Sequence, residues 1–445
     1  MRTVAGRGSE LDADALFKLV VDVIDEVHSK ADRSINAIAA CAFWHSLVGV
    51  DREGDPTTPI KTWADNRSGR YAARLRDEFD EAKVHNRTGC HFHSSYWPAK
   101  LLRLRAEEKD AWRRTATWLG AGEFVGMRLT GVAGSSISML SGTGVFDVRR
   151  GGWDEELLSF LKIDAERLPR IIEPRPLADK WRGRWPRLAA AVWHPAVADG
   201  AANSIGSGAA APGTAAVMIG TSAAVRVVLD RAPKKIPKGL FCYQVDDRRY
   251  LLGGALSDGG GLIERLRHML RFDLSENAFV REIAKRGPGA RGLTLMPFFA
   301  GERSTGYSEN AVGSINGLTM AHDAVDVMQV AMEAAGFRLA EILERIESVV
   351  PAERIIASGG ALSASQAWPV VLADIFGRDL ELLRENEASM HGAVLLALGT
   401  TGKIELSDTA APRSSKIKFD PEAHAAYRPA FERHRMHYRN IDIKS

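Results

Sequence analysis

The chain has 445 residues, which is too long for a single hydrophobic core, so two large domains are expected. Hydrophobic residues make up 45% and charged residues 26%, as in ordinary globular proteins, and 59 basic residues nearly balance 56 acidic ones, so nucleic acid is not expected as a partner. Three widely spaced cysteines without a C-x-x-C pair fit a reduced, cytoplasmic protein, and the lack of a signal peptide or a membrane-spanning apolar run argues against a membrane partner.

The N-terminal residues predict a helix followed by strands that end in aromatic and polar side chains. Apolar residues recur at helical spacing over residues 11–30, residues 35–43 read as a buried strand, and residues 60–63 close a β excursion. The strand ends carry His45, Trp63 and Asp65. An aromatic ring can cover the C–H face of a polyol while imidazole and carboxylate groups bind its hydroxyls. The same residues could equally be ordinary core residues, so spacing alone leaves both interpretations open.

Residues 90–93, Cys-His-Phe-His, look like half of a metal site, but no second pair of ligands follows, so no metal centre is expected. Helices are expected over 99–108, 109–119 and 155–161, the last with Asp154 as its N-cap.

The segment 197–226 combines three features that point to phosphoryl transfer. Asp199 heads a run of small residues, residues 206–213 read as a hinge, and two strand-like runs are joined by Gly220-Thr221-Ser222. The tip of such a hairpin offers backbone N–H groups and hydroxyls to a phosphate. Taken alone, Asp199 would be a helix N-cap and the Gly-Thr-Ser tip an ordinary turn. Together they suggest a catalytic carboxylate in a cleft between two domains.

Two further strand-to-glycine turns are expected in the second half of the chain. Residues 250–252 lead into the glycine-rich run 253–261, and residues 354–357 lead into Gly359 and Gly360. A helix that starts after such glycines can bind an anion, although a tight helix–sheet contact explains them too. A strand over 292–299 and a long amphipathic helix over 327–349 lie between them. Turns at the C-terminal ends of strands meet at one edge of an α/β sheet, where ligands bind.

Taken together, these motifs resemble the FGGY carbohydrate kinase family, and within it the gluconokinase-like branch. The resemblance runs from Glu10 to residues 427–438 and is most specific at residues 313–318, with 326–327 and 331–333 at the family's spacing. It departs at Val330, where a small residue is usual, at Arg103, where Trp is usual, and at Thr305 and Tyr307, where the wider family carries Pro and Trp.

The resemblance implies an α/β fold with two ribonuclease-H-like domains, of the actin/hexokinase/sugar-kinase kind, around a central cleft. A sugar-binding N-terminal domain would span residues 1–208 and an ATP-binding C-terminal domain residues 209–445. Asp199 would be the general base. The phosphates of ATP would meet Gly220, Thr221, Ser222 and Gly260, its nucleoside would meet Gly359 and Gly360, and the sugar would meet His45, Trp63, Asp65 and Tyr96.

The activity implied is ATP- and Mg²⁺-dependent phosphorylation of a sugar acid, foremost D-gluconate to 6-phospho-D-gluconate. Another sugar, such as xylulose, and a kinase-dead homologue that binds sugar or nucleotide are the alternatives. Arg67, Lys100 and His45 are open candidates for binding the substrate carboxylate. An actin-like structural ATPase shares the fold, but the segments Trp-His-Ser and Trp-Ala-Asp argue against it. The family is often dimeric, so a homodimer is a further expectation.

The N-terminal domain is expected to lack its first strands. Family members begin with a strand that ends in an Asp-x-Gly-Thr turn, whose Asp usually holds Mg²⁺, and two more strands follow. Here Met1 leads almost directly into the first helix. A start codon further upstream is the preferred explanation, and a degenerate homologue is the other. Without those strands, helices lose an apolar face and strand edges stay unpaired, so the chain as given is expected to be poorly soluble or inactive.

Overall fold

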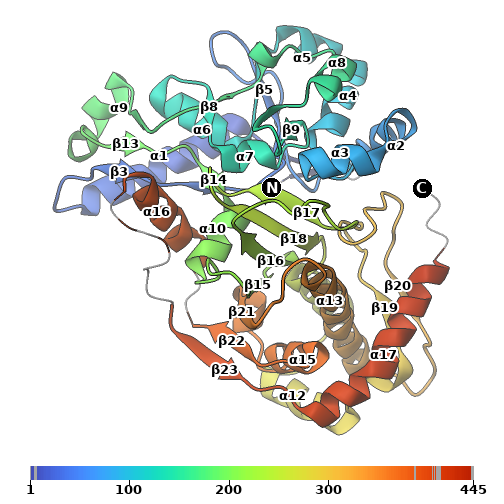
Figure 1. The fold of residues 1–445 in the computed structure, drawn as a ribbon. Helices are drawn as coiled ribbons and strands as arrows, with labels where there is room; N and C mark the ends of the chain where they lie inside the picture. Colours follow the sequence, from blue (N-terminus) through green and yellow to red (C-terminus); the bar gives the residue numbers. More distant parts are fainter. Residues whose placement is uncertain are drawn as a thin grey trace.

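The chain folds into two halves that pack against each other, drawn in blue to green and in yellow to red in Figure 1. The computed structural model describes residues 2–4, 8–384, 387–402, 404, 406 and 412–441. Helix α16 (Ala388–Thr400), late in the chain, returns to the N-terminal half and packs on α10 (Asp199–Gly206). None of the helices within the described residues is long and apolar enough to cross a membrane.

A seven-stranded mixed sheet in the order β17-β18-β16-β15-β21-β22-β23 forms the centre of the C-terminal half. Strands β17, β18, β16 and β15 are antiparallel neighbours, β15, β21 and β22 are parallel, and β23 adds an antiparallel edge. The strands are β15 (Thr214–Ile219), β16 (Ala223–Leu229), β17 (Phe241–Gln244), β18 (Tyr250–Leu256), β21 (Arg354–Ser358), β22 (Leu380–Leu383) and β23 (Ser414–Ile417).

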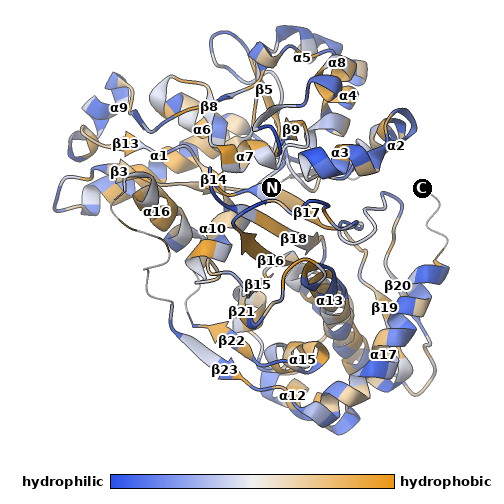
Figure 2. Ribbon diagram, viewed as in Figure 1, coloured by the Kyte–Doolittle hydropathy of each residue, from blue (hydrophilic) through white to orange (hydrophobic). Residues whose placement is uncertain are grey.

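The two faces of this sheet are covered by different helices. Val225 and Val227 of β16 belong to the large core that includes α13 (Ala324–Glu347). Ala224 and Val228 alternate with them and pack in a second core with α10 and α16. Because both faces are covered, the strands are apolar almost throughout, as the orange ribbons at the centre of Figure 2 show. Helix α10 therefore lies directly against β16.

The rest of the C-terminal half surrounds this core with helices and one hairpin. These elements are α11 (Gly260–Met269), α12 (Glu276–Arg286), β19 (Thr294–Met296), β20 (Ser314–Asn316), α14 (Gly360–Ser363), α15 (Ala367–Phe376) and α17 (Pro421–Asn440).

The N-terminal half is made of helices and short strands, and none of its sheets within the described residues has more than three strands. Its helices are α1 (Ala13–Lys30), α2 (Gly69–Glu78), α3 (Glu81–Thr88), α4 (Trp97–Glu107), α5 (Lys109–Arg114), α6 (Ala121–Thr130), α7 (Ile137–Ser141), α8 (Glu155–Leu161) and α9 (Asp179–Arg184). Its strands are β1 (Arg2–Val4), β2 (Gly8–Leu11), β3 (Ala37–Ile38), β4 (Cys41–Ala42), β5 (Val48–Val50), β6 (Ile60–Lys61), β7 (Thr117–Leu119), β8 (Gly134–Ser135), β9 (Phe146–Asp147), β10 (Gly152–Trp153), β11 (Arg170–Ile171), β12 (Arg175–Pro176), β13 (Val192–Trp193) and β14 (Val197–Ala198).

Several predicted elements of this half differ from the structure. The buried strand expected over 35–43 is two half-exposed pieces, β3 and β4, because each pairs over only two residues, with β13 and β14. The helix expected over 109–119 ends at Arg114, because Trp118 and Leu119 are buried where β7 pairs with β5. Strands β1 and β2 pair ahead of α1, so Met1 does not lead almost directly into the first helix.

The glycine-rich run 253–261 is also assigned differently by the structure. Gly253 and Gly254 lie inside β18 rather than in a turn. A methyl group on Gly253 would lie 3.0 Å from the Arg226 side chain, and one on Gly254 would lie 2.8 Å from Ile342 of α13. These glycines therefore make room for neighbouring side chains, and the turn begins only at Ser257.

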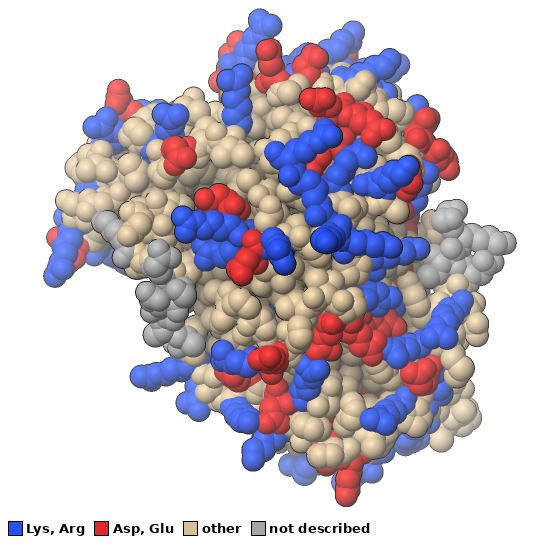
Figure 3. Space-filling view, in the orientation of Figure 1, with Lys and Arg blue, Asp and Glu red and all other residues tan. Residues whose placement is uncertain are grey.

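Charged side chains are spread over the surface with both signs mixed, as Figure 3 shows for one face. This distribution agrees with the nearly balanced totals in the sequence.

Candidate active site

A narrow cavity of about 60 Å³ lies between the two halves. Its N-terminal wall includes Trp44, His45, Trp63 and Tyr96, and its C-terminal wall includes Ser222, Arg226, Tyr243, Arg303 and Tyr307. Asp199, at the start of α10, also lines the cavity and is its one carboxylate among the described lining residues. Three of the four predicted sugar residues, the predicted base and one predicted phosphate residue therefore line one space.

Asp199 is the first residue of α10 and directly follows β14. Its side chain is half-buried, and Oδ1 accepts a hydrogen bond from the Gly200 amide at 2.7 Å. The N-cap of α10 is Ala198, so the reading of Asp199 as a helix cap is wrong. Burial raises the pKa of Asp199, while the nearby Arg226 and Arg303 oppose that change. A carboxylate with a raised pKa is a better proton acceptor than an ordinary surface aspartate.

Gly220, Thr221 and Ser222 form the tip of the β15–β16 hairpin, as the sequence predicts. Among the hydrogen bonds of the described residues, the amides of Thr221 and Ser222 donate to no acceptor, and Thr221 is exposed. The Gly260 amide, in contrast, donates to the Gly220 carbonyl at 2.7 Å. Thr221 and Ser222 thus offer donors to a ligand, whereas Gly260 joins α11 to the hairpin tip.

The three predicted glycine turns meet at one edge of the sheet. A methyl group on Gly260 would lie 2.6 Å from the Ala361 side chain and 2.7 Å from the Gly220 carbonyl oxygen. Gly359 has a φ of 111°, and a methyl group there would overlap the Ile219 carbonyl. No atom lies near the side-chain position of Gly360, which is exposed. The sheet edge thus leaves open space beside Gly360.

His45 lines the cavity and has one ring nitrogen, Nδ1, bound to the backbone. Its Nδ1 lies 2.6 Å from the Gly142 carbonyl oxygen, and its ring lies edge-on to Tyr96 with centroids 4.6 Å apart. Burial lowers the pKa of His45 well below its ordinary value, so the ring is neutral. A neutral ring that donates through Nδ1 can only accept through Nε2. His45 also has a φ of 67°, in the left-handed region, which is typical of residues held in place by their surroundings.

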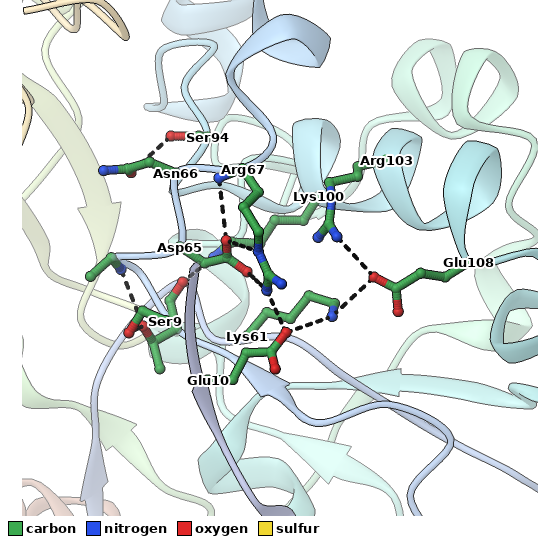
Figure 4. A network of polar contacts seen from close by, with 12 residues as sticks. Ser9, Glu10, Lys61, Asp65, Asn66, Arg67, Ser94, Lys100, Arg103 and Glu108 are labelled. Atoms are coloured by element: carbon green, nitrogen blue, oxygen red, sulfur yellow. Dashed lines mark hydrogen bonds and ion pairs between the residues drawn. The ribbon is translucent and has the colours of Figure 1, made fainter. Parts of the chain in front are cut away.

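Asp65 does not line the cavity. It is fully buried, and its Oδ1 accepts from Nε of Arg67 at 2.7 Å. Figure 4 shows Arg67 bridging Asp65 and Glu10, with Lys61 linking Glu10 to Glu108. The geometry makes Asp65 a support for the loop that follows Trp63.

Two of the candidates for the substrate carboxylate are already occupied. Arg67 is held by Asp65 and Glu10. Lys100 Nζ donates to the carbonyls of His45, Thr62 and Ser95 at 2.6 to 2.8 Å. Burial lowers the pKa of Lys100 to about 7. Lys100 therefore ties together the loops that carry the sugar-facing residues.

Sequence reasoning missed four residues of the C-terminal wall: Arg226, Tyr243, Arg303 and Tyr307. The hydroxyls of Tyr243 and Tyr96 are 2.7 Å apart, and the Arg303 guanidinium lies 4.8 Å from the centre of the Trp63 ring. Arg226 could have been noticed, because it is a charge inside an otherwise apolar strand. Arg303 lies beyond β18 in the loop that follows β19, and no local pattern brings it to this cavity.

Comparisons with known proteins match both halves of the chain. The model of the N-terminal domain of the FGGY family of carbohydrate kinases matches residues 5–183, and that of the C-terminal domain matches residues 215–400. Gluconokinase of Bacillus subtilis (strain 168) is 28% identical over 421 residues, 90% of this chain and 81% of the relative. Xylulose kinase of Streptomyces rubiginosus is 28% identical over 405 residues, 89% of this chain and 80% of the relative.

The fold agrees with these matches. The crystal structure of gluconate kinase from Lactobacillus acidophilus superposes with a TM-score of 0.90 and 28% identity, covering 100% of this chain and 92% of the other. The expected two-domain α/β architecture is thus confirmed, and so is the expected enzyme class, ATP-dependent phosphotransferases with an alcohol group as acceptor. Family models on both halves and this agreement in fold lead to one conclusion: the chain belongs to the FGGY family of carbohydrate kinases.

Proposed function

We propose that the chain phosphorylates a sugar acid with ATP and that D-gluconate is the foremost substrate; turnover would overturn the expectation that the chain is inactive. The position of Asp199 carries this proposal, since this side chain is the one carboxylate among the described residues that line the cavity. Similarity to gluconokinases supports the choice of substrate. Similarity to xylulose kinases supports xylulose as the second candidate.

The chemistry needs one proton acceptor and well-placed phosphates. Asp199 accepts the proton of the sugar hydroxyl as its oxygen bonds to the γ-phosphorus, while the bond from that phosphorus to the bridging oxygen breaks and ADP leaves. The amides and hydroxyls of Thr221 and Ser222 bind phosphate oxygens, and Gly220 and Gly260 shape the turn around them. The nucleoside lies against Gly359 and Gly360, with open space beside Gly360 to receive it.

In the sugar-binding wall, the ring of Trp63 covers the C–H face of the substrate. His45 and Tyr96 supply an acceptor and a hydroxyl for its alcohol groups. Asp65 acts only by holding the loop. We further propose that residues 1–208 form the sugar-binding domain and residues 209–445 the ATP-binding domain. A cytoplasmic location and a homodimer stay predictions.

Mg²⁺ is expected to bind together with the phosphates of ATP. The described residues contain no group of three or more His, Cys, Asp or Glu side chains placed to hold a metal ion. An Mg²⁺ ion on a triphosphate needs only one or two carboxylates, with water and phosphate oxygens completing its shell. Asp258 is a carboxylate beside the phosphate turn, because it immediately precedes Gly259 and Gly260, and its Oδ2 accepts from the Ala300 amide at 2.9 Å, so Oδ1 would be its ligand atom. When bound, the ion would neutralise phosphate charge.

A coupled assay of ADP release tests the proposal. D-gluconate should support turnover better than D-xylulose, and Asp199→Asn should lower kcat by roughly 10²- to 10⁴-fold. Asp247→Asn, an exposed aspartate in the β17–β18 turn, is the matched control. An undiminished rate with Asp199→Asn would refute the assigned base. Calorimetry that detects sugar and nucleotide binding without turnover would instead favour the non-catalytic alternative.

A further inference from the structure

We propose that Arg226 binds the carboxylate of the substrate and sets the preference for a sugar acid over a neutral sugar. This inference rests on the proposed function, because it names the group that recognises the acid end of that substrate. Four observations on the surroundings of Arg226 support it.

Arg226 lies on the α10 side of the sheet, in a space that its neighbours leave free. It alternates along β16 with Val225 and Val227, so its side chain shares a face with Ala224 and Val228. A methyl group on Gly200 of α10 would lie 3.0 Å from Arg226 Nε, and one on Gly253 of β18 would lie 3.0 Å from Arg226 Cγ. Arg226 is thus one of the neighbours for which these glycines leave room, together with Trp44 at 2.7 Å from the methyl position on Gly200 and the Val225 carbonyl oxygen at 2.5 Å from that on Gly253.

The guanidinium is buried without a partner of its own. Arg226 is only 7% exposed, and its Nε and Nη1 have no hydrogen-bond partner among the described residues. Asp199 is the nearby carboxylate, yet no ion pair within 4.0 Å joins it to Arg226. A buried charge without partners is costly, and a guanidinium matches a carboxylate through two parallel hydrogen bonds. A bound carboxylate would supply the missing acceptors.

The position of Arg226 suits the acid end of the substrate better than the transferred phosphate. Ser222, at the hairpin tip, is four residues before Arg226 along a nearly extended chain, so their Cα atoms are about 13 Å apart. Both residues line the same cavity, as does Asp199. A six-carbon acid whose terminal hydroxyl meets Asp199 can extend its carboxylate away from the tip. Arg226 is thus placed for the substrate rather than for the γ-phosphate.

The other positively charged side chains near the cavity make contacts with protein groups. Arg67 and Lys100 are held by the contacts described above. Arg303 stacks on Trp63 and donates to the Leu256 carbonyl at 3.3 Å, so it joins the two walls of the cavity. Of the two arginines that line the cavity, Arg303 has one buried donor without a partner among the described residues, Nε, whereas Arg226 has two, Nε and Nη1, so Arg226 is the better candidate to bind an anion.

The test compares D-gluconate with D-glucitol, which replaces the carboxylate by a neutral hydroxymethyl group. Calorimetry on the full chain measures binding whether or not turnover occurs. The wild type should bind gluconate at least tenfold more tightly than glucitol. Arg226→Gln should weaken gluconate binding by about 10- to 100-fold and change glucitol binding less than twofold. Arg248→Gln, an exposed arginine in the β17–β18 turn, should change neither.

Arg226→Lys keeps the charge but loses the paired geometry, so it should bind gluconate with intermediate affinity. Its melting temperature and that of Arg226→Gln check that both variants fold. Equal losses for gluconate and glucitol, or a lower kcat with an unchanged KM for gluconate, would overturn the role of Arg226. A wild type that prefers xylulose or glucitol to gluconate would overturn the proposed substrate itself. If the wild type prefers gluconate and Arg226→Gln keeps that preference, only the role of Arg226 is overturned.

Discussion

At the scale of single residues, the site depends on charges held away from water. Asp199, Arg226 and Lys100 have pKa values shifted by burial, each toward its neutral form. A ligand stabilises such a group when it supplies the missing hydrogen-bonding or charged partner, or when it takes the proton. Burial also shifts the pKa of a group far from the cavity, Glu333 of α13.

Glu333 predicts a measurable dependence of stability on pH. Its Oε1 accepts from Gln329 and from the Gly289 amide, Oε2 has no partner among the described residues, and burial raises its pKa to about 7. Because the folded pKa is raised, the stabilisation is complete below about 4.5 and is lost as the pH rises through 7. The wild type should therefore lose roughly 2 to 4 kcal/mol relative to Glu333→Gln between pH 5 and pH 8.

Thermal or urea unfolding of both proteins at the two pH values measures this difference. Glu344→Gln, a more exposed glutamate on the same helix, is the control and should follow the wild type. Parallel pH profiles for the wild type and Glu333→Gln would contradict the assignment.

Lys100 predicts a defect in sugar binding without direct contact to the sugar. Lys100→Met removes three hydrogen bonds to the loops carrying His45, Thr62 and Ser95 and leaves buried carbonyls unpaired. The KM for the sugar should rise at least tenfold while the KM for ATP stays within about twofold. Steady-state kinetics with each substrate varied in turn measures both values, and equal increases in both would speak against this positioning role.

At the scale of elements, the helix that carries Asp199 is held by a contact between backbones. A methyl group on Gly206 of α10 would overlap the Ala388 carbonyl of α16, and one on Gly392 would overlap the Ala202 carbonyl. Glycine at both positions lets the two helices cross without side chains between them. The position of Asp199, the proposed base, therefore depends on two glycines in distant parts of the sequence.

Gly206→Ala and Gly392→Ala should each displace α10 and lower kcat at least tenfold, since small errors in the position of a base are costly. Gly183→Ala is the control, because no atom lies near its side-chain position in α9. Kinetic assays together with circular dichroism separate a displaced base from global unfolding. Normal kcat in a folded Gly206→Ala variant would show that α10 tolerates the shift.

The elements also show what the sequence could and could not predict. The hairpin around Gly220, the N-cap Asp154 and the long α13 follow from local patterns, and the structure agrees with these predictions. The prediction of one strand over residues 35–43 was wrong, because the length of a strand depends on partner strands far along the chain. Arg226 and Arg303 were missed for the same reason, since their importance comes from a cavity formed by both halves.

At the scale of the whole molecule, the two halves are joined by contacts around the cavity. Asn86 of α3 accepts from the Ile236 amide at 3.1 Å, His85 bonds the Leu240 carbonyl at 2.7 Å, and His91 accepts from the Gly239 amide at 3.0 Å. The cavity between the halves is narrow in this structure. We expect the halves to move apart when a six-carbon acid enters.

Small-angle scattering tests this motion. Asn86→Ala removes contacts to the loop over 233–236 and should enlarge the radius of gyration of the ligand-free protein, whereas Asn440→Ala, an exposed asparagine at the end of α17, should not. Addition of gluconate and a non-hydrolysable ATP analogue should return Asn86→Ala to the wild-type value. Identical scattering from all three proteins would rule out a role for this contact in closure.

The crossing of α10 and α16 also has a consequence for biosynthesis. Ribosomes make the segment that bears Asp199 long before they make its counterpart, which ends at Thr400. Folding of nascent chains generally proceeds domain by domain from the first residues synthesised. In a nascent chain, the contact that holds α10 can therefore form only after translation has passed the last turn of α16.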